Sequence, residues 1–245
     1  SVKTTRSSTI SAIEKTLAET TELAATAAQN MISTYTLTVA EIASNPTLFD
    51  PKSTPEQKQA FIQSKVESYY MRFGGMTDTE GYDAVHDVDI SGEAFFQEAI
   101  KGSSYMSSPY MDGDDIFLFV SAPIKEGDTI HGVLYFQCDA QILQSIVEEI
   151  QIGEEGESYI LDKNGVTIAG GDEQAFLEQE NITEEAKKNP DNQDLQTLAS
   201  IEAKMLAGET GIAFYTYTED NSRNIQGYTP IPGTDGWSVA VTMDE

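Results

Sequence analysis

The first part of the chain is dominated by apolar residues at helical spacing. They recur at steps of three, four or seven, and no Gly or Pro interrupts them before Pro46. They stand at Ile10, Ile13, Leu17, Ala24, Ala28, Met31, Ile32, Tyr35, Val39 and Ile42. This period predicts one helix of about 40 residues within 1–45. Because its stripe is rich in Ala and Thr, we expect the helix to pack along the rest of the chain, along a second copy of itself, or along both.

After Pro46 the pattern changes to short apolar runs separated by turns, and it occurs twice. Asp78-Thr-Glu-Gly81 and Asp162-Lys-Asn-Gly165 are both Asp-x-x-Gly turns that follow an apolar stretch. Later in each half a strand ends in Pro-Ile and a β-rich strand follows it. These strands are Phe119–Ile124 and Gly132–Phe136 in the first half, and Gly227–Ile231 and Gly236–Val241 in the second. The second half differs mainly by a polar, helix-rich insertion from Gly171 to Gly208, broken at Pro190.

These patterns predict an α+β fold in which a long N-terminal helix precedes two tandem units, each an antiparallel sheet with flanking helices. Apolar residues at helical spacing from Ile142 to Ile150 predict a short connector helix. The predicted boundaries are 1–45 for the long helix, 46–140 for the first unit, 141–153 for the connector and 154–245 for the second unit.

The charge and the cysteine content exclude several classes of protein. The chain carries 14 Lys and Arg against 41 Asp and Glu, a net charge of −27, so phosphate backbones and anionic lipid surfaces would repel it. We therefore expect no nucleic-acid partner. The single Cys138 cannot form an internal disulfide, and the spacings of a zinc site are absent. No run approaches the ~18 to 20 apolar residues of a membrane span.

Catalytic and cofactor motifs are also missing from the sequence. It contains no nucleophile elbow, no His-Glu-x-x-His, no phosphate loop and no dinucleotide fingerprint, so we expect neither an enzyme nor a bound cofactor. His86 and His131 stand among turn residues and are predicted to be surface loop residues. Asp112-Gly-Asp-Asp115 lacks the ligand periodicity of a calcium loop and predicts a hairpin turn.

A binding pocket has better support, between the first Asp-x-x-Gly turn and the first Pro-Ile strand. Here Phe95 and Phe96 begin a short helix, and the Gly/Ser-rich stretch after it carries Tyr105, Ser107 and Tyr110. Aromatic faces and hydroxyls on loops over a sheet are typical of a small-molecule site. The alternative is that the two phenylalanines are core residues and the two tyrosines are edge residues.

In the order of these motifs the chain resembles a double Cache (dCache) sensor domain, whose two units are PAS-like. The resemblance rests on the Ser-Gly-x-x-Phe-Phe helix start, the Ser-x-Pro-Tyr loop and the Pro-Ile strands, and it covers essentially the whole chain. It implies the extracytoplasmic ligand-binding region of a bacterial membrane receptor, most often a methyl-accepting chemotaxis protein and less often a histidine kinase or cyclic-dinucleotide enzyme. It further implies membrane spans flanking this chain, a homodimer, ligand in the membrane-distal unit and signalling by helix displacement.

The resemblance also suggests which residues bind the ligand. Amino-acid-binding members hold the ligand with an Arg, a Trp-Tyr pair, a Tyr and Asp in the next loop, and a late Asp. Phe95 and Phe96 take the Trp-Tyr places, and Tyr110 and Asp112 take the loop places. Two positions depart from the family pattern: Glu93 stands where the family has Arg, and the place of the late Asp falls near Gln137. The residues we expect to line the pocket are Arg72, Glu93, Phe95, Phe96, Tyr105, Ser107, Tyr110, Asp112, Phe117, Ser121 and Gln137.

These departures change the ligand that we expect. Glu93 would repel a carboxylate, and Gln137 supplies no charge for an ammonium, so we expect a neutral polar ligand such as a nucleobase-like heterocycle. A small carboxylate held by Arg72 and Lys101 is the first alternative. The second is a module without a small ligand of its own that binds a ligand-loaded solute-binding protein.

Overall fold

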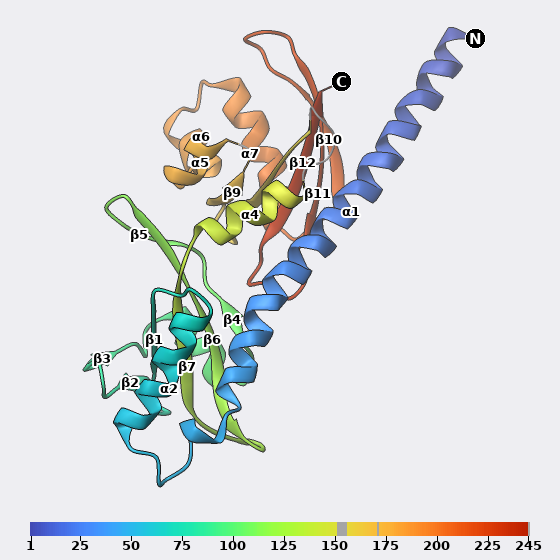
Figure 1. The fold of residues 1–245 in the computed structure, drawn as a ribbon. Coiled ribbons are helices and arrows are strands. Elements are labelled where there is room, and N and C mark those ends of the chain that lie inside the picture. Colours follow the sequence, from blue (N-terminus) through green and yellow to red (C-terminus); the bar gives the residue numbers. More distant parts are fainter. Residues whose placement is uncertain (151–155, 171, 245) are drawn as a thin grey trace. The chain divides into compact units, whose positions relative to one another are not determined.

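The computed structural model describes residues 1–150, 156–170 and 172–244. The chain divides into two compact units, Met31–Ile142 and a unit that joins Ser1–Asn30 to Leu143–Glu245. We call them the first-sheet unit and the second-sheet unit. Helices and antiparallel sheets occur in both, so the predicted α+β fold with a long N-terminal helix is confirmed (Figure 1).

The long helix α1 spans Val2–Ala43 without interruption (Figure 1). The predicted apolar stripe is its buried face: Leu17, Ala28 and Val39 are almost completely buried, whereas Leu23 and Leu37 are exposed. Residues up to Asn30 belong to the second-sheet unit and residues from Met31 to the first-sheet unit. The weak apolar character of the helix is therefore compensated by packing within both units.

The first-sheet unit is built on the strand order β1-β7-β6-β4, with β5 also paired to β6. The strands are β1 (Phe73–Met76), β4 (Tyr105–Met106), β5 (Tyr110–Asp112), β6 (Asp115–Glu126) and β7 (Thr129–Asp139). A separate ribbon pairs β2 (Tyr82–Asp83) with β3 (Val88–Asp89), and a 3-10 turn covers Pro46–Leu48. The predicted hairpin turn at Asp112–Asp115 is confirmed, because these two residues pair across β5 and β6.

Two helices pack on opposite faces of this sheet. Helix α2 (Pro55–Ser68) begins with a capping box formed by Thr54 and Gln57, and its Ile62 lies against Phe136 beside Gly74. Helix α3 (Ala94–Ile100) contacts β6 and β7 through the other face, where the Ser121 hydroxyl donates to the Phe95 carbonyl at 2.6 Å. Since neighbouring strand residues point to opposite faces, the odd-numbered residues from Phe117 to Pro123 of β6 and from Val133 to Gln137 of β7 face α3.

The second-sheet unit has the strand order β10-β11-β12-β8-β9. Its strands are β8 (Glu157–Leu161), β9 (Thr167–Gly170), β10 (Gly211–Thr216), β11 (Arg223–Pro230) and β12 (Ser238–Asp244). The predicted helical insertion is present as α5 (Glu173–Leu177), α6 (Ile182–Lys188) and α7 (Gln193–Leu206). Helix α1 packs on β11 at Gly227, where a side-chain Cβ would lie 2.2 Å from Thr21 Oγ1, so only glycine leaves room for this contact.

The two Asp-x-x-Gly turns have the same local structure. Asp78 Oδ1 accepts the amides of Glu80 and Tyr82, and Asp162 Oδ1 accepts the amides of Asn164 and Val166. The glycine that closes each turn has a positive φ, 94° at Gly81 and 84° at Gly165. The repeat seen in the sequence is therefore a repeat of local structure as well.

The predicted connector is helix α4 (Gln141–Glu149). Its Gln144 is buried and bonds the backbone of Gly170 twice, donating to the carbonyl at 2.9 Å and accepting from the amide at 2.8 Å. The predicted boundary between connector and second unit, at 153 and 154, lies outside the described residues. Among the helices that the structure describes, none is both long and apolar enough to cross a membrane.

Candidate ligand-binding site

The α3 face of the first sheet gathers most of the predicted site residues. Gln137 of β7 pairs with Phe73 of β1 on one side and with Phe119 of β6 on the other, so these three side chains form a row across the sheet. Tyr135 pairs with Ser121 in the adjacent row, and Phe117 pairs with Tyr110 at the far end. All of these strand residues share a face because their numbers differ by two along each strand.

Six aromatic side chains on this face form a continuous set, which we call the ring cluster: Phe73, Phe95, Tyr110, Phe117, Phe119 and Tyr135. Phe95 of α3 stacks on Phe119 with ring centroids 4.2 Å apart. Tyr110 stacks on Phe117 at 5.9 Å and meets Phe119 edge-on at 5.5 Å. Phe95 and Tyr135 are buried, whereas Phe73, Tyr110, Phe117 and Phe119 are partly exposed, so these four can offer ring surface to a bound molecule.

The carboxylate of Glu93 contacts one of these partly exposed rings, Tyr110, at its hydroxyl. It precedes α3 and does not cap the helix with its side chain; instead its Oε2 accepts the Tyr110 hydroxyl at 2.9 Å. Burial, and then the hydrogen bond to this carboxylate, raise the pKa of Tyr110 above its ordinary value. Tyr110 therefore remains a neutral hydrogen-bond donor, and Glu93 leaves acceptor capacity for another donor.

A buried carboxylate that the sequence analysis did not select lies beside Tyr135. Asp83 is 1% exposed, and its Oδ2 accepts the Tyr135 hydroxyl at 2.5 Å and lies 2.7 Å from His86 Nδ1. Its Oδ1 accepts the amides of Val85 and His86. A Cβ at Gly75 would stand 2.5 Å from Asp83 Oδ2, so the glycine makes room for this group. The Asp83 carboxylate is therefore fully engaged in fixing the β2 ribbon to the sheet.

Several predicted site residues have structural partners instead of open surfaces. Phe96 is buried in the core with Ile90 and Ala99. The Ser107 hydroxyl donates to the Ser108 carbonyl and accepts the Phe119 amide. The Ser121 hydroxyl anchors α3, as described above. The hydroxyls of Ser107 and Ser121 are therefore used within the unit. Phe95 and Phe96 are both buried, which agrees with the alternative that the phenylalanine pair belongs to the core.

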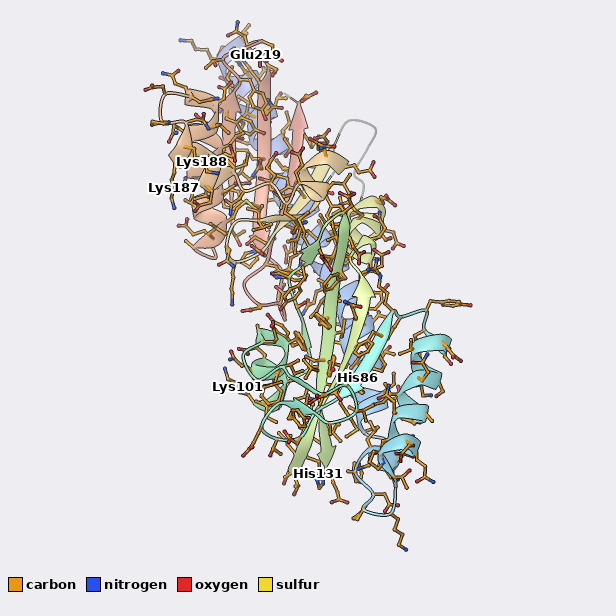
Figure 2. All side chains as sticks on the ribbon, turned by 90° about the vertical axis from the view of Figure 1, so that its left-hand side faces the viewer. His86, Lys101, His131, Lys187, Lys188 and Glu219 are labelled. Carbon is orange, nitrogen blue, oxygen red and sulfur yellow. The ribbon has the colours of Figure 1, made fainter. Side chains whose placement is uncertain are left out.

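The predicted cationic residues are held in ion pairs. Arg72 contacts Asp115 at 2.6 Å and Asp139 at 3.0 Å, and these carboxylates raise the pKa of its guanidinium. Lys101 lies 3.2 Å from Glu98, and Figure 2 shows it at the edge of the unit. Asp112 is exposed at the β5–β6 turn, and Tyr105 is partly buried on β4. Neither cation is poised to hold a carboxylate.

Phe73 and Phe119 are the members of the ring cluster that the sequence pattern did not bring into the predicted set. Phe119 lies midway between the predicted residues Phe117 and Ser121, so strand alternation would have placed it on their face and this signal was present. Phe73 required the pairing of β1 with β7, in which it lies opposite Gln137, a residue far from it in the chain. A cavity of about 310 Å³ elsewhere in the same unit, beside Phe49, Tyr82 and His131, is lined by none of the predicted site residues.

The family model described as a Cache domain, dCache_1, matches residues 1–245, and the chain therefore belongs to the Cache domain family. A search of curated proteins finds no match.

Solved structures show the same fold. The ligand-binding domain of the Pseudomonas fluorescens chemoreceptor CtaA in complex with L-isoleucine is 16% identical, with 99% of this chain and 96% of that chain covered and a TM-score of 0.70. The ligand-binding domain of the Pseudomonas aeruginosa chemoreceptor PctB in complex with L-Arg is 18% identical, with 95% and 88% covered and a TM-score of 0.66. The extracellular domain of the putative histidine kinase mmHK1S-Z2 is 11% identical, with 94% and 96% covered and a TM-score of 0.68.

Proposed function

We propose that this chain is the extracytoplasmic sensor region of a bacterial chemoreceptor and that it binds a small, neutral, ring-containing molecule on the α3 face of the first sheet, in the membrane-distal unit. One observation carries the proposal. The partly exposed rings of Tyr110, Phe117 and Phe119 stand beside the partly exposed amide of Gln137, which makes no hydrogen bond within the described part of the chain. Ring faces bind a flat molecule by stacking, and the amide both donates and accepts.

The charges around the ring cluster support a neutral ligand. The CtaA and PctB structures hold amino acids, but here Glu93 lies beside Tyr110, and Arg72 is paired with two carboxylates. A ligand carboxylate would meet Glu93 and would have to compete with Asp115 and Asp139 for the guanidinium. The same pairing weighs against a small dicarboxylate ligand.

Signalling is proposed to run through α1. Residues of this helix belong to both units, so a ligand that changes the packing of the first-sheet unit acts on a helix that the second-sheet unit shares. Leu23 and Leu37 are exposed on α1 and are two heptads apart, a spacing suited to a partner helix from a second copy. Cross-linking of the full-length receptor with Leu23→Glu and Leu37→Glu tests this role of α1, and we expect the dimer to be lost. A dimer that remains intact would show that α1 does not form the dimer contact.

A thermal-shift screen on this chain tests the ligand class. The panel contains uracil, hypoxanthine and their nucleosides, the common L-amino acids, and small mono- and dicarboxylates. A ligand at ~100 times its dissociation constant adds ~2.7 kcal/mol to the stability of the folded state, so a specific binder raises the midpoint clearly. We expect a rise with the heterocycles and none with the amino acids or carboxylates. The opposite pattern would refute the proposal.

Variants then place the ligand. Gln137→Leu should weaken binding about 10-fold, since a hydrogen bond to a buried ligand contributes about 1.5 kcal/mol. Gln63→Leu, on the exposed face of α2, is the matched control and should leave the affinity unchanged. Phe119→Ala should weaken binding further, with the fold checked by circular dichroism. If the whole panel is inactive while a solute-binding protein co-purifies with the chain, the module binds a protein instead of a metabolite.

A further inference from the structure

A second hollow lies within the second-sheet unit. It has a volume of about 530 Å³, and its walls come from β8, β11 and β12, from α7, and from the segment that leads into α6. Gly227 of β11 faces α1, whereas Asn224 and Gln226 line the cavity, so the cavity is on the sheet face opposite to that helix. The volume is within the range of small-molecule sites, roughly 300 to 1,000 Å³.

Two residues that line this cavity each carry a buried polar atom without a hydrogen-bond partner among the described residues. Glu202 of α7 is 4% exposed and its Oε2 is unpartnered; Asn224 is 5% exposed and its Nδ2 is unpartnered. Gln226, in the same wall, is satisfied, because it donates to the Tyr159 hydroxyl at 2.8 Å and accepts from Thr242 at 3.5 Å. Buried polar groups nearly always have partners, so it is unusual that these two residues of the lining leave one acceptor and one donor without a partner.

The charge of the lining has one sign. Besides Glu202 the cavity is lined by Glu157, Asp172, Glu180, Asp220 and Asp244, and no Lys, Arg or His is among the described residues that line it. Lys187 and Lys188 of α6 pair with Glu184 and Glu185 instead, and Figure 2 shows them at the outer edge of this helical region. The potential in the cavity therefore favours a cation.

Aromatic faces complete the lining. Tyr159, Tyr215 and Tyr217 contribute to the wall, and the rings of the last two meet edge-on with centroids 5.4 Å apart. Ring faces attract organic cations, and they offer no ligand to a metal ion. Within the described residues no group of three His, Cys, Asp or Glu side chains is placed to hold a metal ion.

We propose that this cavity binds a small protonated amine that also carries a hydroxyl or carbonyl oxygen. The ammonium group donates to Glu202 Oε2, and the ligand oxygen accepts from Asn224 Nδ2. The site is separate from the ring cluster and takes a ligand of opposite character, so it stands or falls independently of the function proposed above.

The protonation of Glu202 adds a signature to this binding. Burial, and then the Glu180 carboxylate, raise the pKa of Glu202 to about 8, against a smaller opposing contribution from a side-chain hydrogen bond with Tyr159. Without a ligand the carboxyl is mostly protonated at pH 7, so an amine must displace that proton. Affinity for an amine should rise between pH 6 and pH 8 and level off above. The other groups that titrate around the cavity are the carboxylates and tyrosines named above, of which Glu180 also has a raised pKa.

Isothermal titration calorimetry with three matched probes tests the proposal. 4-Amino-1-butanol carries both groups, n-butylamine lacks the oxygen and 1-butanol lacks the charge. At pH 8.5 we expect the amino alcohol to bind more tightly than the amine, and the alcohol to bind not measurably. Equal binding of all three, or binding of none, would overturn the proposal.

Two variants and one control localise the binding. Glu202→Gln keeps the shape of the side chain and should weaken amine binding by about 10- to 100-fold, the value of a charge-assisted hydrogen bond, and abolish its pH dependence. Asn224→Leu removes an unpartnered donor, so it should fold normally and lose only the preference for the amino alcohol over the amine. Glu209→Gln, an exposed residue, changes the net charge equally and should have no effect. Unchanged binding in both cavity variants would refute the site.

Discussion

The hydrogen bond between Tyr135 and Asp83 should contribute measurably to the stability of the first-sheet unit. Tyr135→Phe removes only the hydroxyl, and the ring keeps its place against Phe95 and Phe119. Asp83 is 1% exposed, and its carboxylate has four hydrogen-bonding groups around it in the native chain. In the variant it keeps three of them, because the Tyr135 hydroxyl is gone. Because hydrogen bonds to charged groups contribute about 1.5 to 3 kcal/mol, we expect the free energy of unfolding to fall by that amount.

A surface pair offers a matched control for this change. The Tyr82 hydroxyl donates to Asp87 Oδ1 at 2.5 Å, the same length as the buried bond, but Tyr82 is 41% exposed. Water replaces the lost partner there, so Tyr82→Phe should change the free energy of unfolding by less than about 0.5 kcal/mol. The difference between the two variants isolates the effect of burial.

Urea denaturation followed by circular dichroism measures both variants, and a double-mutant cycle with Asp83→Asn measures the coupling. Contacting residues in one hydrogen-bond network couple by about 0.5 to 3 kcal/mol, so the double variant should be more stable than the sum of the single changes predicts. Trp237 is the only tryptophan and belongs to the second-sheet unit, so its fluorescence reports separately on that unit. The reasoning fails if Tyr135→Phe is no more destabilising than Tyr82→Phe.

Four further outcomes are expected. Gly227→Ala should destabilise the chain by about 1 to 3 kcal/mol in urea denaturation because its Cβ would lie 2.2 Å from Thr21 Oγ1, and adding Thr21→Ala should recover part of the loss. Burial raises the pKa of Cys138 to about 12, so a thiol reagent at pH 8 should react far more slowly with the native chain than with the urea-unfolded chain. Arg72→Ala should cost less than about 1 kcal/mol and leave ligand affinity unchanged, since its ion pairs are partly exposed; a large loss of affinity would indicate a carboxylate ligand. Glu202→Gln should raise the free energy of unfolding at pH 9 and have little effect on it at pH 4. In the unfolded chain Glu202 ionises near pH 4.5, whereas in the folded chain its pKa is about 8, so the wild-type chain loses stability as the pH rises between these values.

The long helix and the tandem sheets could be predicted because each depends on local period and turn chemistry. The stripe through Leu17, Ala28 and Val39 is a helical period, and the turns at Asp78 and Asp162 need only residues within five positions of each aspartate. Such features are independent of what packs against them.

The composition of the site depended on pairings that the sequence does not contain. Phe73 joins Phe119 only because β1 and β6 flank β7, and Arg72 is occupied only because two carboxylates from other strands reach it. The unpartnered atoms of Glu202 and Asn224 could not be anticipated either, since a missing hydrogen bond is a property of the packed structure. Sequence patterns selected side chains that are chemically suited to bind a ligand. The strand pairing then determines which of these side chains already have partners within the fold and which do not.

The two buried carboxylates show why burial alone does not identify a binding residue. Asp83 of β2 and Glu202 of α7 are both nearly inaccessible, and each interacts with a tyrosine. Asp83 is surrounded by four hydrogen-bonding groups, so its charge is compensated within the unit and a ligand would have to displace those partners. Glu202 has an oxygen without a partner beside an empty volume, so an added cation gains the compensation that the fold does not provide. The same reasoning predicts that Asp83→Asn will lower stability, whereas Glu202→Gln will weaken amine binding and, at pH 9, raise stability.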